Sequence, residues 1–257
     1  MDLMTPAMGF VVGFCVGLTG MGGGALMTPL LVLTLGVSPS VAIGTDLAYA
    51  ALTKAVGAWQ HWRQDTVEPR LVLYLAGGSL PASLLAVGIV RWLQKANWTG
   101  LDQLMSRLLA SVLVVVAISL GWRALVDPQE KLGSKLDVFP VRYPTSIVLI
   151  GALGGLMVGF TSVGAGTLVM ALLTVFYRDI SPVRLVGSDI LHGALLACTA
   201  ALAHMAIGHL DLDLLLGLLI GSVPGVLLGS HLATKAPGQI LRLTLALLIL
   251  VSAVKLV

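Results

Sequence analysis

Charged residues are scarce in this sequence. Asp, Glu, Lys and Arg make up 11% of the 257 residues, whereas apolar residues make up 57%. Soluble domains carry roughly 25% charged residues, so this shortage excludes an ordinary soluble domain. Long apolar runs separated by short polar loops predict an all-α polytopic membrane protein.

Several kinds of functional motif are also missing. Cys15 and Cys198 lie in apolar stretches without a CxxC pair or a His at ligand spacing, so we interpret them as inert small hydrophobic residues. No Gly-Lys-Ser/Thr follows the glycines of residues 20–24, which argues against a phosphate loop. The net charge of +3 is spread over many loops and gives no reason to expect nucleic acid. We expect no catalytic residue, metal or cofactor.

Apolar residues gather in eight long segments, most of which match the ~20 residues that cross ~30 Å of hydrocarbon. Residues 1–6 contain no Lys or Arg, so we expect no cleaved signal peptide. Only residues 127–142 are polar enough for a linker, which divides the chain into a first membrane repeat (1–126) and a second (143–257). The apolar segments cover about residues 9–36, 40–61, 71–92, 106–126, 145–176, 183–207, 212–233 and 240–257.

The second half repeats motifs of the first. Gly44-Thr45-Asp46 returns 143 residues later as Gly187-Ser188-Asp189. Such internal duplication predicts two homologous repeats of four segments each. Further matches are Ser38-Pro39 with Ser181-Pro182, His61 with His204, Gly78-Ser79-Leu80-Pro81 with Gly221-Ser222-Val223-Pro224, and, at an offset of 142, residues 17–24 with residues 159–166.

The first segment of each repeat is too long for one upright helix and is interrupted by glycines. Residues 9–36 would span about 42 Å as a continuous helix, and each internal Gly costs ~1 kcal/mol relative to Ala. Two half-helices therefore either cross the membrane as one broken segment or return as a re-entrant hairpin. If the segments cross, seven loop Lys and Arg residues face each side of the membrane. If they re-enter, ten face one side and four face the other. The positive-inside rule favours re-entry, hence an inverted repeat with both termini outside.

Two carboxylates are predicted to lie inside the membrane. Asp46 and Asp189 each follow a Pro-marked helix start by seven residues, or ~10 Å. An ionisable residue at that depth indicates a functional site, although each Asp could instead anchor the backbone of a neighbouring broken helix. His61 and His204 stand near helix ends, where we expect solvated or interfacial imidazoles. The predicted proton-coupling or path-lining residues are Thr45, Asp46, His61, Ser188, Asp189, His192 and His204.

The glycine-rich breaks are candidate anion sites. A helix that restarts inside the membrane presents unpaired N–H groups and the positive end of its dipole, and broken helices in both halves indicate a transporter site. Close helix packing through small residues is the alternative. Lys54 adds a deep positive charge on the same helix as Asp46, unless it snorkels. The predicted substrate-binding residues are Thr19, Gly22, Gly23, Gly24, Lys54, Thr161, Ser162, Gly164 and Gly166.

These motifs resemble those of a known family. Residues 17–24 ahead of Thr28-Pro29, then Gly36-Val37-Ser38-Pro39, Gly44-Thr45-Asp46-Leu47, Thr53-Lys54, His61 and Gly78-Ser79-Leu80-Pro81 are similar to the sulfite exporter TauE/SafE family, also grouped as the 4-toluene sulfonate uptake permeases. The resemblance implies a multi-pass secondary carrier of the bacterial inner membrane. Its substrates would be sulfite, organosulfonates or related small sulfur-containing anions, often in export.

The chain departs from the family pattern at two places. Ala165 stands where the first half has Gly23, and the loop after His61 reads Thr66-Val67-Glu68-Pro69-Arg70 instead of the more usual Val-Asp-Trp. We expect the anion between the breaks, near the ammonium of Lys54, with a coupling proton on Asp46, Asp189 or His192. The expected partners are the anion and membrane lipid, with homo-oligomerisation left open. A membrane assembly factor and an intramembrane enzyme are the rival hypotheses.

Overall fold

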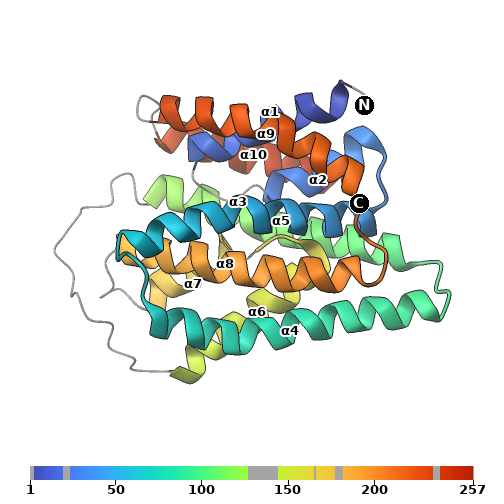
Figure 1. Ribbon diagram of the computed structural model, residues 1–257, viewed down its shortest axis with the longest axis horizontal. Helices are drawn as coiled ribbons and strands as arrows, with labels where there is room; N and C mark the ends of the chain where they lie inside the picture. The colour runs from blue at the N-terminus through green and yellow to red at the C-terminus, as the bar shows by residue number, and fades with distance from the viewer. Residues whose placement is uncertain are drawn as a thin grey trace.

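The computed structural model describes residues 3–19, 24–126, 144–164, 166–176, 182–233 and 238–256. These ranges form ten α-helices and contain no strand (Figure 1), which confirms the all-α prediction. The first half contains α1 (Met4–Thr19), α2 (Gly24–Leu35), α3 (Pro39–Arg63), α4 (Pro69–Lys95) and α5 (Leu101–Val126). The second half contains α6 (Pro144–Thr161), α7 (Leu168–Phe176), α8 (Pro182–Met205), α9 (Leu212–Ala233) and α10 (Gly238–Leu256).

The helices have the length and surface of a membrane bundle. Five of them, α4, α5, α6, α8 and α9, are long and apolar enough to cross a membrane. α3 is equally long, with 25 residues, but carries Asp46 and Lys54. Large apolar side chains such as Leu149 and Val254 are 69% and 71% exposed, as expected where lipid replaces water. The prediction of a multi-pass membrane protein is confirmed.

Both predicted long segments are interrupted. The segment predicted over residues 9–36 consists of α1 and α2, and the segment predicted over 145–176 consists of α6 and α7. We call residues 20–23 the first break and residues 162–167 the second break. The first break lies outside the described residues, as does the predicted linker 127–142. The division into 1–126 and 143–257 therefore stays a prediction.

Glycines allow two helix pairs to touch through their backbones. A Cβ on Gly13 of α1 would lie 2.5 Å from the carbonyl oxygen of Ser222 in α9, and a Cβ on Gly155 of α6 would lie 2.2 Å from that of Ser79 in α4. Only glycine permits such an approach. α1 therefore packs along α9 and α6 along α4, while α3 packs on α8 and α5 on α10.

The first two helices form an antiparallel pair. Thr34, near the end of α2, donates a hydrogen bond to the sulfur of Met8, near the start of α1, at 3.3 Å. α1 thus begins, and α2 ends, at the same end of the bundle, where α10 also ends (Figure 1). How this pair sits in a bilayer, and whether the two repeats are inverted, stay predictions.

The centre of the molecule is apolar around α3. Its fully buried members include Met27 and Leu31 of α2, Ile43 and Leu47 of α3, and Leu196 of α8. α3 begins at Pro39, whose fixed φ and missing N–H suit the first turn of a helix. This start positions Asp46 two turns inside the core.

Candidate functional site

Asp46 is completely buried and binds two hydroxyl groups. Its Oδ2 accepts hydrogen bonds from Thr28 Oγ1 of α2 at 2.5 Å and from Ser162 Oγ of the second break at 2.7 Å. Thr28 Oγ1 also lies 2.6 Å from Ser162 Oγ. The three oxygens form a triangle that joins α2, α3 and the second break. We call it the Asp46 triangle.

The second break has a backbone that favours glycine. Ser162 has a φ of 62° and Gly164 a φ of 116°, so the chain leaves α6 through the left-handed region. The amides of Leu168 and Val169 both donate to the carbonyl of Gly164, at 3.2 and 3.4 Å. Both amides are therefore hydrogen-bonded to the protein and are not available to an anion. An anion at the start of α7 could contact only the amides of residues before Leu168.

A cavity of about 40 Å³ opens beside the second break. It exceeds the roughly 10–15 Å³ that one buried water requires. Gly24 of α2, Lys54 of α3 and Gly193 of α8 line it, and the second break contributes Ser162, Gly164, Gly166 and Thr167. The structure thus brings together five of the predicted substrate-binding residues: Gly24, Lys54, Ser162, Gly164 and Gly166.

Lys54 directs its ammonium group across the cavity toward α8. A Cβ on Gly193 would lie 2.7 Å from Lys54 Nζ, so the missing side chain of Gly193 makes room for the ammonium. Within the described part of the chain, Lys54 has no hydrogen bond or ion pair. Lys54 is half-buried. Its ammonium can bind a small anion through charge attraction, in a site that is also lined by hydroxyls and glycines.

The remaining predicted substrate-binding residues are placed differently. The side chain of Thr161 is buried and donates to the carbonyl of Met157 in its own helix at 2.7 Å, so the structure shows it as part of the end of α6. Gly22 and Gly23 lie outside the described residues, and Thr19 is described only as the last residue of α1.

Asp189 of α8 is also buried and lies beside the second break. A Cβ on Gly166 would be 3.5 Å from Asp189 Oδ2, and a Cβ on Gly24 would likewise be 3.5 Å from Asp46 Oδ2. Each carboxylate therefore faces a glycine beside the start of a restarted helix, since Gly24 is the first residue of α2 and Gly166 precedes α7 by two residues. Whether Asp46 and Asp189 carry a coupling proton stays a prediction.

The predicted histidines occupy three different environments. His192 is fully buried, and its Nε2 lies 2.8 Å from Ser79 Oγ of α4. His204 is fully buried too, with Nε2 2.9 Å from the carbonyl oxygen of Gly159. The expectation of a solvated or interfacial His204 is wrong, because α6 and the loop at His209 cover the end of α8. His61 is half-buried and contacts Thr66 Oγ1 through Nδ1 at 2.8 Å.

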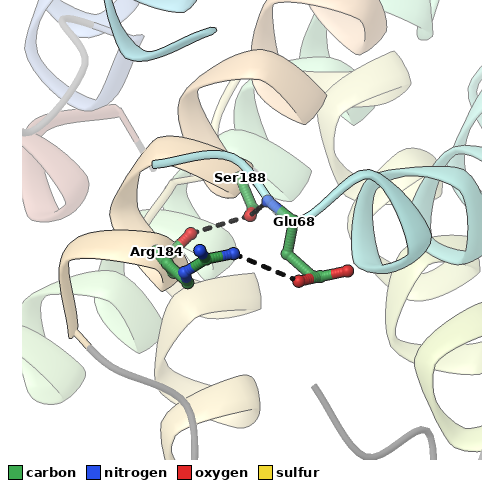
Figure 2. A network of polar contacts seen from close by, with 3 residues as sticks. All are labelled: Glu68, Arg184 and Ser188. Carbon is green, nitrogen blue, oxygen red and sulfur yellow. Dashed lines mark hydrogen bonds and ion pairs between the residues drawn. The ribbon is translucent and has the colours of Figure 1, made fainter. Parts of the chain in front are cut away.

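Thr45 of α3 and Ser188 of α8 each accept a hydrogen bond from the loop residue just before another helix. Thr45 Oγ1 accepts the N–H of Asp211 at 3.1 Å, and Ser188 Oγ accepts the N–H of Glu68 at 2.8 Å. Ser188 also donates to the carbonyl of Arg184 at 2.7 Å. Figure 2 shows Ser188 with Arg184 and Glu68, including the ion pair of Arg184 and Glu68, whose charged groups are 3.6 Å apart. Neither hydroxyl lines the cavity.

Sequence reasoning missed three hydroxyl groups. Thr28 completes the Asp46 triangle, Ser79 contacts His192, and Thr167 lines the cavity. Thr28 and Ser79 stood in the recognised motifs, but nothing in the pattern separated them from other small polar residues in apolar helices. The only available signal was that Thr28 precedes Pro29 inside a helix, where proline frees a backbone carbonyl.

Comparisons with known proteins agree with this architecture. The chain is 41% identical over 258 residues to the probable membrane transporter protein YjnA of Bacillus subtilis (strain 168), with all of both chains covered. It is 23% identical to the probable membrane transporter protein YdhB of the same organism, over 91% of each chain. It is also 31% identical to the Sulfite exporter TauE/SafE family protein 3 of Arabidopsis thaliana, over 130 residues that make up 51% of this chain and 27% of that protein.

No solved structure shows a significant match to the chain. The model of the family described as "Sulfite exporter TauE/SafE" matches residues 6–256, which is nearly the whole sequence. This match covers both breaks, α3 and α8. The chain is therefore a multi-pass membrane protein that belongs to the TauE/SafE sulfite exporter family of membrane transporters.

Proposed function

We propose that this protein is a secondary exporter of sulfite, an organosulfonate or a related small sulfur-containing anion. The observation that supports this function most directly is the ammonium of Lys54, which lines an internal cavity and has no partner within the described residues. Lys54 is half-buried, and a charge without a partner inside an apolar bundle is expensive. An anionic substrate would supply the missing charge.

The lining of the cavity suits a small oxyanion. Thr167 offers a hydroxyl donor, and Gly164, Gly166 and Gly193 have no side chain that would fill the space for an anion. Sulfite and sulfonate groups carry several acceptor oxygens around one centre, so they can accept hydrogen bonds from several directions at once. The dipole of α7 adds positive potential at the second break.

Alternating access would use the two glycine-broken pairs. We infer that α1–α2 and α6–α7 are re-entrant hairpins that enter the bacterial inner membrane from opposite sides, which makes the repeats inverted. The contact between Thr34 and Met8 supports a hairpin in the first pair. Inverted repeats that meet at broken helices near the membrane centre are typical of secondary transporters. The coupling ion in this proposal is a proton, and a homo-oligomer is compatible with it.

Transport in liposomes tests the proposal. Purified protein would be reconstituted into vesicles loaded with labelled sulfite or methanesulfonate, and the release of the label would be followed with and without a proton gradient. We expect release that depends on the protein and leaves the anion chemically unchanged. Conversion of the anion would instead support an intramembrane enzyme. Absence of flux for every sulfur-containing anion would support an assembly factor and reject the transporter.

A further inference from the structure

The Asp46 triangle contains more oxygen contacts than the two hydroxyl groups have protons. Its three oxygens, Asp46 Oδ2, Thr28 Oγ1 and Ser162 Oγ, lie 2.5, 2.6 and 2.7 Å from one another. Every one of these distances is that of a hydrogen bond, and each hydrogen bond needs one proton. Thr28 and Ser162 each supply a single proton. If Asp46 were ionised, one pair of oxygens would be in contact with no proton between them.

A proton on Asp46 removes this conflict. Asp46 Oδ2 then donates in one of its two contacts instead of accepting in both. Each oxygen of the triangle donates once and accepts once, so all three contacts become hydrogen bonds in a closed ring. The other carboxyl oxygen, Asp46 Oδ1, is buried and has no partner among the described residues. A bare carboxylate oxygen in such a place is costly, whereas the carbonyl oxygen of a neutral acid is much less so.

A metal ion does not fit between these oxygens. Around octahedral Mg²⁺, the smallest of the common oxygen-bound cations, ligands at ~2.0–2.1 Å from the metal lie about 2.9 Å from one another. The oxygens of the Asp46 triangle are closer together than that. Larger cations would separate them further. The spacing matches shared protons.

The charged surroundings of Asp46 allow the proton to leave. α2, the second break and α7 contain no titratable side chain in their sequences. α3 itself carries the titratable residues Tyr49 and Lys54, and α8, which packs on it, carries Asp189, His192 and His204. His209, in the loop after α8, lies against Gly44 of α3. Lys54 is the cation on the same helix, about two turns after Asp46, and a positive charge favours an ionised carboxylate. An anion bound to Lys54 would cancel that influence.

We propose that Asp46 is the proton-binding residue of this transporter and that its proton is shared with Thr28 and Ser162. This inference rests on the proposed function for its link to transport. Ser162 belongs both to the Asp46 triangle and to the cavity lining, so protonation and anion binding act on the same hydroxyl. One proton and one monovalent anion then bind together, without a change in net charge. Linkage requires that each ligand raise the affinity for the other by the same factor.

Infrared spectroscopy of the reconstituted protein tests the proton itself. A protonated carboxyl group inside an apolar site has a carbonyl stretch separated from that of ionised carboxylates. We expect such a band near neutral pH in the natural protein and in Asp189→Asn, the matched control at the repeat position. We expect its loss in Asp46→Asn. A band that persists in Asp46→Asn, or that disappears only in Asp189→Asn, would overturn the proposal.

A second variant keeps the test decisive if Asp46→Asn does not fold. Thr28→Val keeps the shape of the side chain but removes one member of the ring. We expect the carboxyl band to shift to a frequency typical of weaker hydrogen bonding. An unchanged band would overturn the ring.

Binding of methanesulfonate tests the coupling, because this anion stays ionised at all pH values used and adds no titration of its own. We expect its affinity to fall about tenfold per pH unit once Asp46 ionises, and to be independent of pH in Asp46→Asn. Unchanged pH dependence in Asp46→Asn would contradict the coupling. If no sulfur-containing anion binds at any pH while the infrared band is present and depends on Asp46, the proposed function fails and the proton site stands.

Discussion

Asp46 and Asp189 stand at matching positions of the two halves, 143 residues apart, but their surroundings differ. Asp46 binds the hydroxyls of Thr28 and Ser162. The residues that correspond to these two in the other half are Met170 and Gly20, neither of which has a hydroxyl group. Lys54 likewise corresponds to Ala197 in the second half, so the second half has no ammonium group at that position. Equal motifs therefore do not make equal sites.

Backbone contacts, in contrast, are shared by both halves. A Cβ on Gly44 would lie 1.8 Å from the carbonyl oxygen of His209, and a Cβ on Gly187 would lie 2.5 Å from that of Thr66. Both pairs follow the offset of 143. Close contact between backbones permits only glycine at these points. The two halves therefore share these backbone contacts and differ in the side chains around their carboxylates.

The largest effect is expected on anion affinity when Lys54 is replaced, since the second half has Ala197 at the matching position. Lys54→Met should lower anion affinity by about 3 kcal/mol, or roughly 100-fold, because the bound anion would lose its charge partner. Equilibrium binding of methanesulfonate measures this. The exposed Lys95→Met serves as the matched control and should bind normally.

Moving the cation to the other half sharpens the same comparison. Ala197 lines the same cavity as Lys54, so a double variant, Lys54→Ala with Ala197→Lys, should recover part of the lost affinity. No recovery, in a variant that folds, would mean that the position of the charge matters as much as its presence.

The second expected effect concerns the shared backbone contacts. Gly44→Ala should destabilise the protein by about 1–3 kcal/mol, since a methyl group must displace a carbonyl, and Gly187→Ala should cost less because its contact is 0.7 Å longer. Denaturant unfolding in detergent measures both. Gly77→Ala meets nothing within 4 Å and should be neutral or stabilising. Equal stability of all three variants would contradict the inferred contacts.

A smaller loss of stability is expected when the hydrogen bonds of Ser188 and Thr45 are removed. Ser188→Ala should cost about 1 kcal/mol, because the N–H of Glu68 loses its acceptor. Thr45→Val should cost a similar amount through the N–H of Asp211. Among the described residues of these two junctions, the ion pair of Glu68 with Arg184 is found at Ser188. Glu68→Gln should therefore produce a loss of at most about 1 kcal/mol that high salt removes. Unfolding at low and high salt separates these contributions.

The smallest effect should depend on pH. Burial lowers the pKa of His209 below its ordinary value of 6.5, although Asp102 opposes this shift. The folded protein holds the imidazole neutral, so its contribution to stability is complete above about pH 6.5 and declines as the pH falls and the unfolded chain takes up a proton. Thr66, which does not titrate, occupies the corresponding position of the other half. His209→Thr should therefore flatten the acid side of the stability profile, and an unchanged profile would contradict a buried neutral imidazole.

The sequence predicted the features that depend on local chemistry. The glycines of residues 162–166 predicted the interruption of the helix, and the proline at residue 39 predicted the start that buries Asp46. Lys54 was predicted to face inward, and it lines the cavity. Each of these features follows from a residue's own conformational or charge preference, which a single sequence displays.

Features that depend on contacts between distant segments could not be predicted. Thr28 and Ser162 are 134 residues apart, and only packing brings their hydroxyls together. The roles of Thr45 and Ser188 depend on loops 166 and 120 residues away. His204 looked like the end of an exposed helix, because the sequence does not show that α6 covers it. The hydroxyl partners of buried groups are therefore the part of this site that required a structure.

The glycine contacts between α1 and α9, and between α6 and α4, restrict how the protein can change shape. Helices joined through their main chains cannot slide along each other, because each glycine would move out of register and the next side chain would collide with a carbonyl. Each pair must therefore travel as a single rigid unit. The contact between α3 and α8 differs, because Gly57 and Gly193 there face the side chains of Ile190 and Lys54. We therefore expect any rearrangement of the helices to occur between α3 and α8.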